Sequence, residues 1–178
     1  MSRITPVELA EMPERIRELV ERVPFHQGRP RNLFTVPARQ EGLFPSWFRF
    51  TMSLLTRGDL TPREREIAIV RTAVHADSSY ELAQHVELAA QAGVDRAELA
   101  DLLGAAAGFG DAEADLIAFV DEVSDSGDAS EETWARLAPR LGESRMVELT
   151  MIVAYYRALA TMLRVLRVPL EPGMTDPR

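Results

Sequence analysis

Residues 61–94 read TPREREIAIVRTAVHADSSYELAQHVELAAQAGV, and this stretch carries the strongest structural signals in the chain. It contains two Ser/Thr-x-x-Glu patterns, which are typical of capping boxes at helix starts: Thr61 with Glu64, and Ser78 with Glu81. Pro62 occupies the first helical position, where its missing N–H costs nothing. The stretch therefore predicts one helix over residues 62–76 and a second over 79–92.

Cap and breaker residues divide the rest of the chain into further helices, and no segment alternates as a strand would. The expected segments are residues 5–22, 33–40 and 45–58, two helices capped by Asp95 and Asp111, and then 130–141 and 143–168. The last is apolar on nearly all sides between Leu149 and Leu163, as in helices buried at a domain centre or between subunits. Residues 169–178 are expected to form a flexible tail. The predicted fold class is all-α, a single-domain helical bundle over residues 1–178.

The composition excludes several kinds of chemistry. The chain has 178 residues, no cysteine and, among its 20 basic residues, only arginine. It therefore has no disulfide, no thiol peroxidase cycle, no thiolate metal site and no amine for a Schiff base. A net charge of −8 argues against nucleic acid or an anionic membrane as a partner. The N-terminal residues lack an apolar signal core, and no uncharged run approaches the ~20 residues that span a bilayer, so we expect a cytoplasmic protein.

Glu66 is the first candidate for chemistry. In the predicted helix it shares a face with Ile69, Val70 and Ala73, so that a carboxylate points into an apolar core. Burial raises the pKa of a carboxylate and suits an acid–base group. The alternative is structural, with Glu66 paired to an arginine such as Arg63, one turn earlier, or to an arginine on another helix.

Glu81 and His85 stand four residues apart on the next helix, on the side that continues through Leu88 and Ala89. A carboxylate beside an imidazole fixes its tautomer and favours its charged form, as proton transfer requires. Two consecutive helices thus direct ionisable groups inward. One alternative is a buried histidine with only a structural role, while Glu81 is engaged in its capping box. Another is a metal ion bound by Glu66, Glu81 and His85.

Three further residues are candidates for substrate binding. Ser78 lies about 10 Å of helical rise from His85, so it is expected to be an N-cap rather than a nucleophile. Trp47 belongs to an aromatic cluster that forms core or lines an apolar pocket. Arg157 lies within the most apolar helix and needs a carboxylate partner, from the protein or from an acidic substrate.

The quoted stretch, together with NLFTVPARQEGLFPSWFRF at residues 32–50, resembles the carboxymuconolactone decarboxylase and alkylhydroperoxidase D superfamily. The resemblance is strong over residues 32–103. Its most specific feature is a glutamate followed after 12, 15 and 19 residues by the other characteristic positions, which here are Glu66, Ser78, Glu81 and His85.

The resemblance also shows where this chain departs from the superfamily. In the peroxidase branch the two middle positions are a redox cysteine pair, whereas this chain has Ser78 and Glu81. Peroxidase activity is therefore expected to be absent. The remaining glutamate and histidine resemble the decarboxylase branch, which needs no cofactor and acts on a small acidic lactone, with the histidine as the proton-transfer group. The resemblance further implies all-helical subunits assembled as a trimer or a trimer-based hexamer.

The leading hypothesis is a cofactor-independent lyase or isomerase for a small carboxylated or lactone-type substrate, with no metal. His85 is expected to be the general acid–base, Glu81 to orient and charge it, and Glu66 to relay or hold a proton. The expected substrate contacts are Arg157, Trp47 and Ser78. Two alternatives remain: a non-catalytic oligomeric binding or scaffold protein of the same fold, and a metal-dependent enzyme that uses the same three residues.

Overall fold

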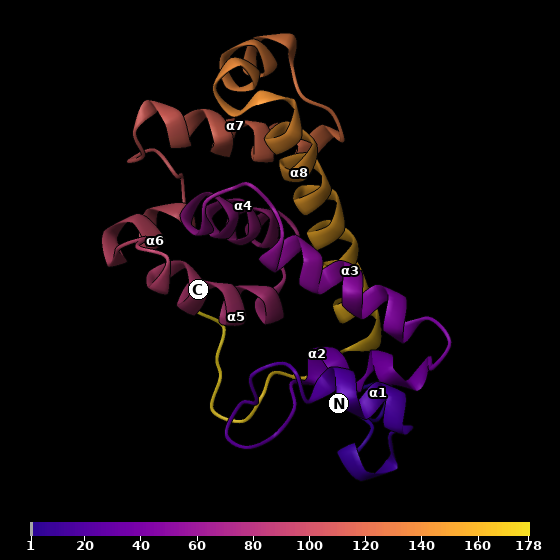
Figure 1. Cartoon of the computed structure of the whole chain (residues 1–178). Helices are drawn as coiled ribbons and strands as arrows, with labels where there is room; N and C mark the ends of the chain where they lie inside the picture. The colour runs from indigo at the N-terminus through magenta and orange to yellow at the C-terminus, as the bar shows by residue number, and fades with distance from the viewer. Residues whose placement is uncertain (1) are drawn as a thin grey trace. The chain divides into compact units, whose positions relative to one another are not determined.

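The structure is a computed structural model that describes residues 2–178, and over these residues it contains helices and no strand (Figure 1). The predicted all-α class is thereby confirmed. Internal contacts divide the chain into two compact units. The first comprises the residues up to Arg57 together with Leu163–Met174, and the second comprises Gly58–Met162 together with Thr175–Arg178. Each unit is described by itself.

The first unit is built from short helices around an apolar core. Its elements are η1 (Leu9–Glu11), α1 (Glu14–Val20), α2 (Asn32–Thr35), η2 (Pro37–Arg39) and α3 (Phe44–Thr56). The core contains Ile16 and Val20 from α1, together with Phe34, Phe44 and Phe48. The last three side chains form an aromatic group with ring centroids 5.4–5.7 Å apart, and such groups bury much apolar surface.

The single helix predicted over residues 5–22 is wrong, because the chain bends at Met12 and Pro13. Met12 has a ψ of 138°, in the extended region. A proline disfavours helical geometry in the residue before it, since its ring collides with the preceding backbone. The helical segment is therefore split into η1 and α1, and the Thr5 pattern does not begin an α-helix.

The second unit contains the helices that carry the candidate site. They are α4 (Pro62–His75), α5 (Ser79–Gln91), α6 (Arg96–Leu102), α7 (Asp111–Ser126) and α8 (Glu131–Leu166), the last turn of which belongs to the first unit. α4 packs against both α5 and α7, and Figure 1 shows it lying between them. Residues 66–73 of α4 are all buried, so this helix forms the centre of the unit.

The α8 helix is interrupted at Gly142, as predicted. This glycine has φ 75° and ψ 166°, a conformation that disfavours a residue with a side chain. After the break the helix is apolar, and among the described residues it is the one helix long and apolar enough to cross a membrane by length and composition; core helices of soluble proteins meet the same criterion. Val147 and Met151 are 59% and 47% exposed on this helix. A cytoplasmic location stays a prediction.

The residues after α8 make defined contacts within the first unit, although a flexible tail was expected. The side chain of Glu171 is buried, and its Oε1 accepts a hydrogen bond from the Asn32 backbone N–H at 2.7 Å. The Asn32 side-chain amide donates to the Pro169 carbonyl at 3.0 Å. These bonds hold the chain beyond Leu166 against the start of α2.

Candidate active site

The α4 helix holds Glu66 in the interior of the second unit. Its start is fixed by the predicted capping box, in which the Thr61 hydroxyl accepts the Glu64 N–H at 3.2 Å and Glu64 Oε2 accepts the Thr61 N–H at 2.9 Å. Packing against α5 and α7 then buries Glu66, which is 3% exposed. The predicted inward direction of this carboxylate is confirmed.

The capping box predicted for Ser78 does not form. Ser78 is the N-cap residue of α5, but its side chain makes no capping bond, and its ψ is 88° where that of the capping Thr61 is 152°. The link from α4 is the physical reason. It is short, Asp77 has a positive φ of 50°, and the Ser78 N–H donates to the Ala73 carbonyl at 3.0 Å. The Ser78 backbone thus closes α4 and is not placed to cap α5.

His85 is bound by Glu66 rather than by Glu81. The His85 Nδ1 lies 2.7 Å from Glu66 Oε2, and both side chains are buried. An ionised carboxylate only accepts hydrogen bonds, so in this pair the neutral imidazole carries its proton on Nδ1. The His85 Nε2 is left to exchange a proton with another molecule. The contact with His85 that the sequence suggested for Glu81 is therefore made by Glu66, and the roles of the three residues in a reaction stay predictions.

Glu81 is a buried carboxyl group without a hydrogen-bond partner. It is 2% exposed, and neither Oε1 nor Oε2 has a partner within hydrogen-bonding geometry. Burial raises the pKa of Glu81 to about 8, against a smaller lowering by the nearby Ser78 hydroxyl, which is not placed to form a hydrogen bond. The neutral carboxylic acid therefore predominates near pH 7, and this group can hold a proton.

Tyr156 of α8 completes the cluster, and the sequence reasoning did not find it. Its ring stands edge-on to the His85 ring, with centroids 5.1 Å apart and an interplanar angle of 89°. Burial, and then the negative charges of Glu66 and Glu81, raise the pKa of this phenol well above its usual value. Both carboxyl groups thus lie near one phenol. In the sequence Tyr156 is one of two adjacent tyrosines in a largely apolar helix, and nothing distinguishes it from Tyr155.

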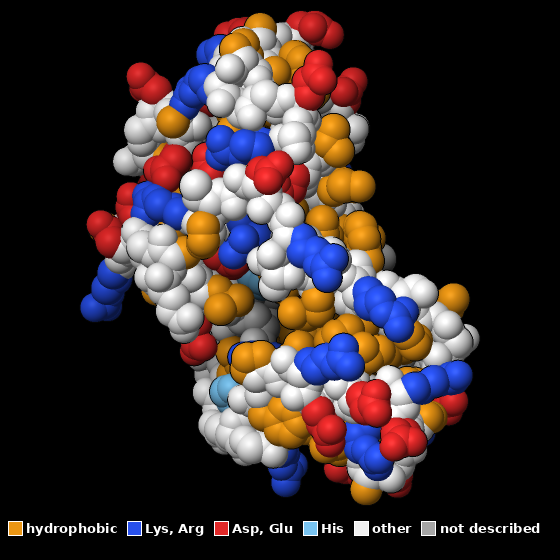
Figure 2. Space-filling view, viewed as in Figure 1, with side chains coloured by type: hydrophobic (Ala, Val, Ile, Leu, Met, Phe, Trp, Pro, Cys, Tyr) orange, Lys and Arg blue, Asp and Glu red, His pale blue; other side chains and the backbone are white. Residues whose placement is uncertain are grey.

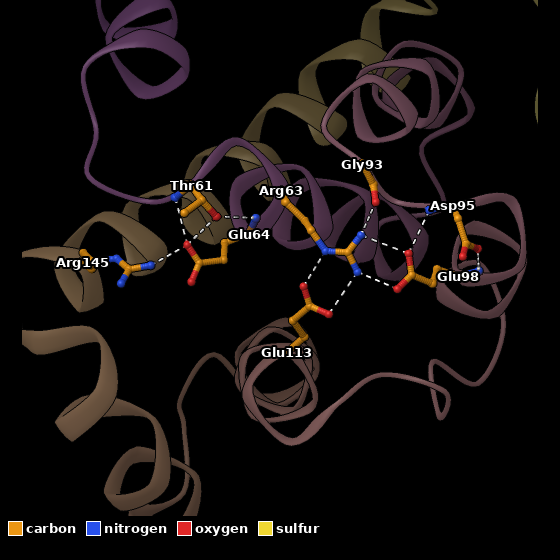
Figure 3. Close-up of polar contacts among 8 residues, drawn as sticks. All are labelled: Thr61, Arg63, Glu64, Gly93, Asp95, Glu98, Glu113 and Arg145. Carbon is orange, nitrogen blue, oxygen red and sulfur yellow. Dashed lines mark hydrogen bonds and ion pairs between the residues drawn. The ribbon is translucent and has the colours of Figure 1, made fainter.

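The arginine nearest Glu66 is its neighbour Arg65, with Nε 3.5 Å from Glu66 Oε1. The alternative that paired Glu66 with Arg63 is wrong, because Arg63 is engaged elsewhere. Figure 3 shows its guanidinium between two carboxylates, with Nε 2.6 Å from Glu113 Oε1 and Nη2 2.6 Å from Glu98 Oε1. Those hydrogen bonds raise the pKa of Arg63 further, so this cation is a fixed part of the fold.

Two of the predicted substrate contacts have structural surroundings of their own. Arg157 Nη1 donates to the Val123 carbonyl at 2.5 Å, near the end of α7, where a cation also compensates the helix dipole. Trp47 belongs to the first unit and packs against Phe34 and Phe44, with ring centroids 6.3 Å and 5.7 Å away. A role of either residue in substrate binding stays a prediction.

Other polar features of the second unit are separate from this cluster. Over residues 2–178, no group of three or more His, Asp or Glu side chains is arranged to hold a metal ion. The metal alternative on Glu66, Glu81 and His85 therefore lacks geometric support.

A pocket of about 500 Å³ opens between the starts of α4 and α7 and the first part of α8, lined by residues that include Glu64 and Arg145.

Comparison with known proteins agrees with the resemblance. Residues 41–122 match the model of the carboxymuconolactone decarboxylase family, and this range includes Glu66, Ser78, Glu81 and His85. The match covers a little under half of the chain, and over these residues the chain is similar to the carboxymuconolactone decarboxylase family. The chain has no cysteine, so it lacks the redox cysteine pair that the resemblance places at Ser78 and Glu81. No curated protein sequence matches the chain.

Solved structures show the same fold at low sequence identity. An uncharacterised peroxidase-related protein from Ralstonia eutropha JMP134, described as an alkylhydroperoxidase AhpD core, has a TM-score of 0.84 and 19% identity over 96% of this chain and 93% of its own. A peroxidase-related protein from Silicibacter sp. TM1040 has a TM-score of 0.80 and 13% identity over 91% and 87%. A C-to-A variant of the debrominase Bmp8, in complex with 2,3,4-tribromopyrrole, has a TM-score of 0.72 and 16% identity over 95% and 91%.

Proposed function

We propose that this protein is a cofactor-independent lyase or isomerase that moves a proton on a small carboxylated or lactone-type substrate. The observation that supports this most is the 2.7 Å bond between Glu66 and His85 Nδ1. A buried carboxylate that holds one imidazole nitrogen leaves the other free and basic, which is the arrangement of a general acid–base.

Each polar group of the cluster has a role in this proposal. His85 Nε2 removes or delivers the proton, and Glu66 orients the ring and stabilises the imidazolium that forms. Glu81 holds a proton near pH 7. Thiol chemistry has no place here, because the chain has no cysteine, whatever reaction its structural neighbours perform.

A β,γ-unsaturated lactone such as α-angelica lactone provides a direct assay. One proton leaves the α-carbon, another is added at the γ-carbon, and the double bond moves into conjugation with the carbonyl without any net change in atoms. The reaction is followed by ultraviolet absorbance. We expect the wild-type protein to accelerate it and His85→Gln to reduce the rate by about 10²–10⁴-fold, the usual contribution of general acid–base catalysis.

His26→Gln is the matched control, because His26 belongs to the first unit and its ring bonds the Pro172 carbonyl there. This variant should keep the wild-type rate, and circular dichroism should show that all three proteins are equally folded. A wild-type protein no faster than buffer, or a folded His85→Gln variant as fast as wild type, would contradict the proposal. The second result would favour the non-catalytic binding or scaffold alternative.

A further inference from the structure

Glu81 has two hydrogen-bonding positions that the protein itself does not use. The carboxyl group is 2% exposed, and neither oxygen has a partner in the described structure. Leaving a buried polar group unpaired is costly, so such groups in native proteins usually have a structural or functional explanation. The Ser78 hydroxyl lies near Glu81 and slightly lowers its pKa but forms no hydrogen bond with it, and His85, one turn later, is bound through Nδ1 to Glu66.

Burial favours the neutral form of Glu81. Glu66 from α4 and Tyr156 from α8 belong to the same buried cluster, and both carboxyl groups act on the Tyr156 phenol. A second carboxylate at this place would add a like charge in a region that excludes water. The pKa of Glu81 is raised to about 8 by burial alone. A neutral carboxyl group has an O–H donor, which an ionised one lacks.

Within the described residues, the cation that contacts the cluster is already paired with a carboxylate. Arg65 lies against Glu66, and the Arg157 guanidinium donates to the Val123 carbonyl. A carboxylate next to Glu66 would therefore enter without a partner, whereas a neutral carbonyl oxygen would satisfy the Glu81 O–H. These contacts favour a neutral lactone over a carboxylated substrate, the two classes in the proposed function.

We infer that Glu81 donates a hydrogen bond from its protonated carboxyl group to the carbonyl oxygen of an uncharged substrate, and so stabilises the enolate that forms during the reaction. This inference rests on the proposed function and narrows its substrate class to neutral carbonyl compounds such as lactones. Glu81 thereby acts as a catalytic residue distinct from His85.

The reaction begins with proton transfer from the substrate to His85. His85 Nε2 takes the proton from the carbon beside the carbonyl group, and the C–H electron pair becomes a C=C bond. The carbonyl π electrons move to the oxygen, which becomes an enolate oxygen and accepts a stronger hydrogen bond from Glu81. The electron pair on the oxygen then re-forms the carbonyl group, and the double bond moves next to it. The γ-carbon takes the proton back from the imidazolium. A donor aimed at a developing oxyanion typically contributes about 10²–10³-fold to the rate.

A phenolate mimics this enolate, so 4-nitrophenol binding to the intact protein tests the inference without a known substrate. Its visible absorbance reports both binding and ionisation. We expect the wild type to bind it, Glu81→Gln to bind within a few-fold because an amide also donates, and Glu81→Leu to lose at least about 10-fold. In the lactone assay the wild-type rate should fall above pH 8 as Glu81 ionises, and Glu81→Gln should lack this fall.

Each outcome has a distinct meaning. Equal binding by wild type and a folded Glu81→Leu variant would overturn the inference, as would a wild type that does not bind 4-nitrophenol or a Glu81→Gln variant that keeps the high-pH fall. If Glu81→Leu fails to fold, the pH profile of Glu81→Gln decides alone. A His85→Gln variant with the wild-type lactone rate would instead contradict the proposed function, even if phenolate binding still depended on Glu81.

Discussion

At the scale of single residues, Glu66 rather than Glu81 makes the contact with His85 that the sequence suggested. Periodicity identified Glu66, Glu81 and His85 as inward-facing, and the structure buries all three. The periodicity of the sequence could not identify the hydrogen-bond partner of His85. Glu81 lies one helical turn before His85, but the bond goes to Glu66 on another helix. Which acid bonds His85 depends on how α4 packs against α5, and the spacing of residues along one helix does not predict that packing.

The raised pKa of Glu81 makes the stability of the fold depend on pH. The folded state holds this proton up to about pH 8, whereas the unfolded state releases it near 4.5. Between these values the folded state binds more protons, so the free energy of unfolding falls as pH rises. Relative to wild type, Glu81→Gln should gain stability from pH 5 to pH 8.5, by at most about 5 kcal/mol at ~1.4 kcal/mol per pKa unit.

Urea unfolding of both proteins across this pH range measures the difference. Glu87→Gln is the control, because Glu87 is an exposed glutamate on the same helix and its replacement should leave the pH dependence unchanged. Parallel stability curves for wild type and Glu81→Gln would show that Glu81 ionises in the fold as it does in water.

At the scale of helices, one sequence pattern had two different outcomes. Thr61 and Ser78 both precede a glutamate by three residues, but only Thr61 forms the capping box. The flanking chain makes the difference, because a three-residue link between α4 and α5 uses the Ser78 N–H to close the preceding helix. Most helix positions could be predicted from caps and breakers, whereas the conformation of a short connection could not.

Thr61→Ala and Ser78→Ala should therefore have different effects on stability. Removing the Thr61 hydroxyl leaves the Glu64 N–H without its cap and should cost about 1 kcal/mol. Ser78→Ala removes no capping bond and should cost less than about 0.5 kcal/mol. Urea midpoints measured side by side provide the comparison, and an equal loss in both variants would mean that Ser78 caps α5 in solution.

At the scale of the whole molecule, α8 has an exposed stripe that the chain does not cover. Its members are spaced four and three residues apart, as in a coiled-coil seam: Val147, Met151, Ala154, Ala158 and Thr161. None of them is charged, in a protein with a net charge of −8. Figure 2 shows hydrophobic side chains in a line over the region of α8. We predict that the expected homo-oligomer, trimer or hexamer, forms through this stripe.

Ala154→Glu should weaken self-association, because it places a charge in the middle of this stripe. Ala135→Glu is the matched control, since Ala135 is exposed on the first part of α8 and lies outside the stripe. We expect light scattering to give a lower mass for Ala154→Glu than for wild type and Ala135→Glu. If all three proteins are monomeric, or all share one larger mass, the stripe is not the interface.

The central claim is that Glu66 holds His85 by Nδ1 and leaves Nε2 to move the proton. Nitrogen-15 spectra of histidine-labelled protein test it most directly, with the His85→Gln variant assigning the signals. The geometry predicts a neutral His85 ring with its proton on Nδ1 and a bare Nε2, and a change in this pattern in Glu66→Leu. A neutral ring protonated on Nε2 would contradict the account, because Nδ1 would then have no proton to donate to Glu66.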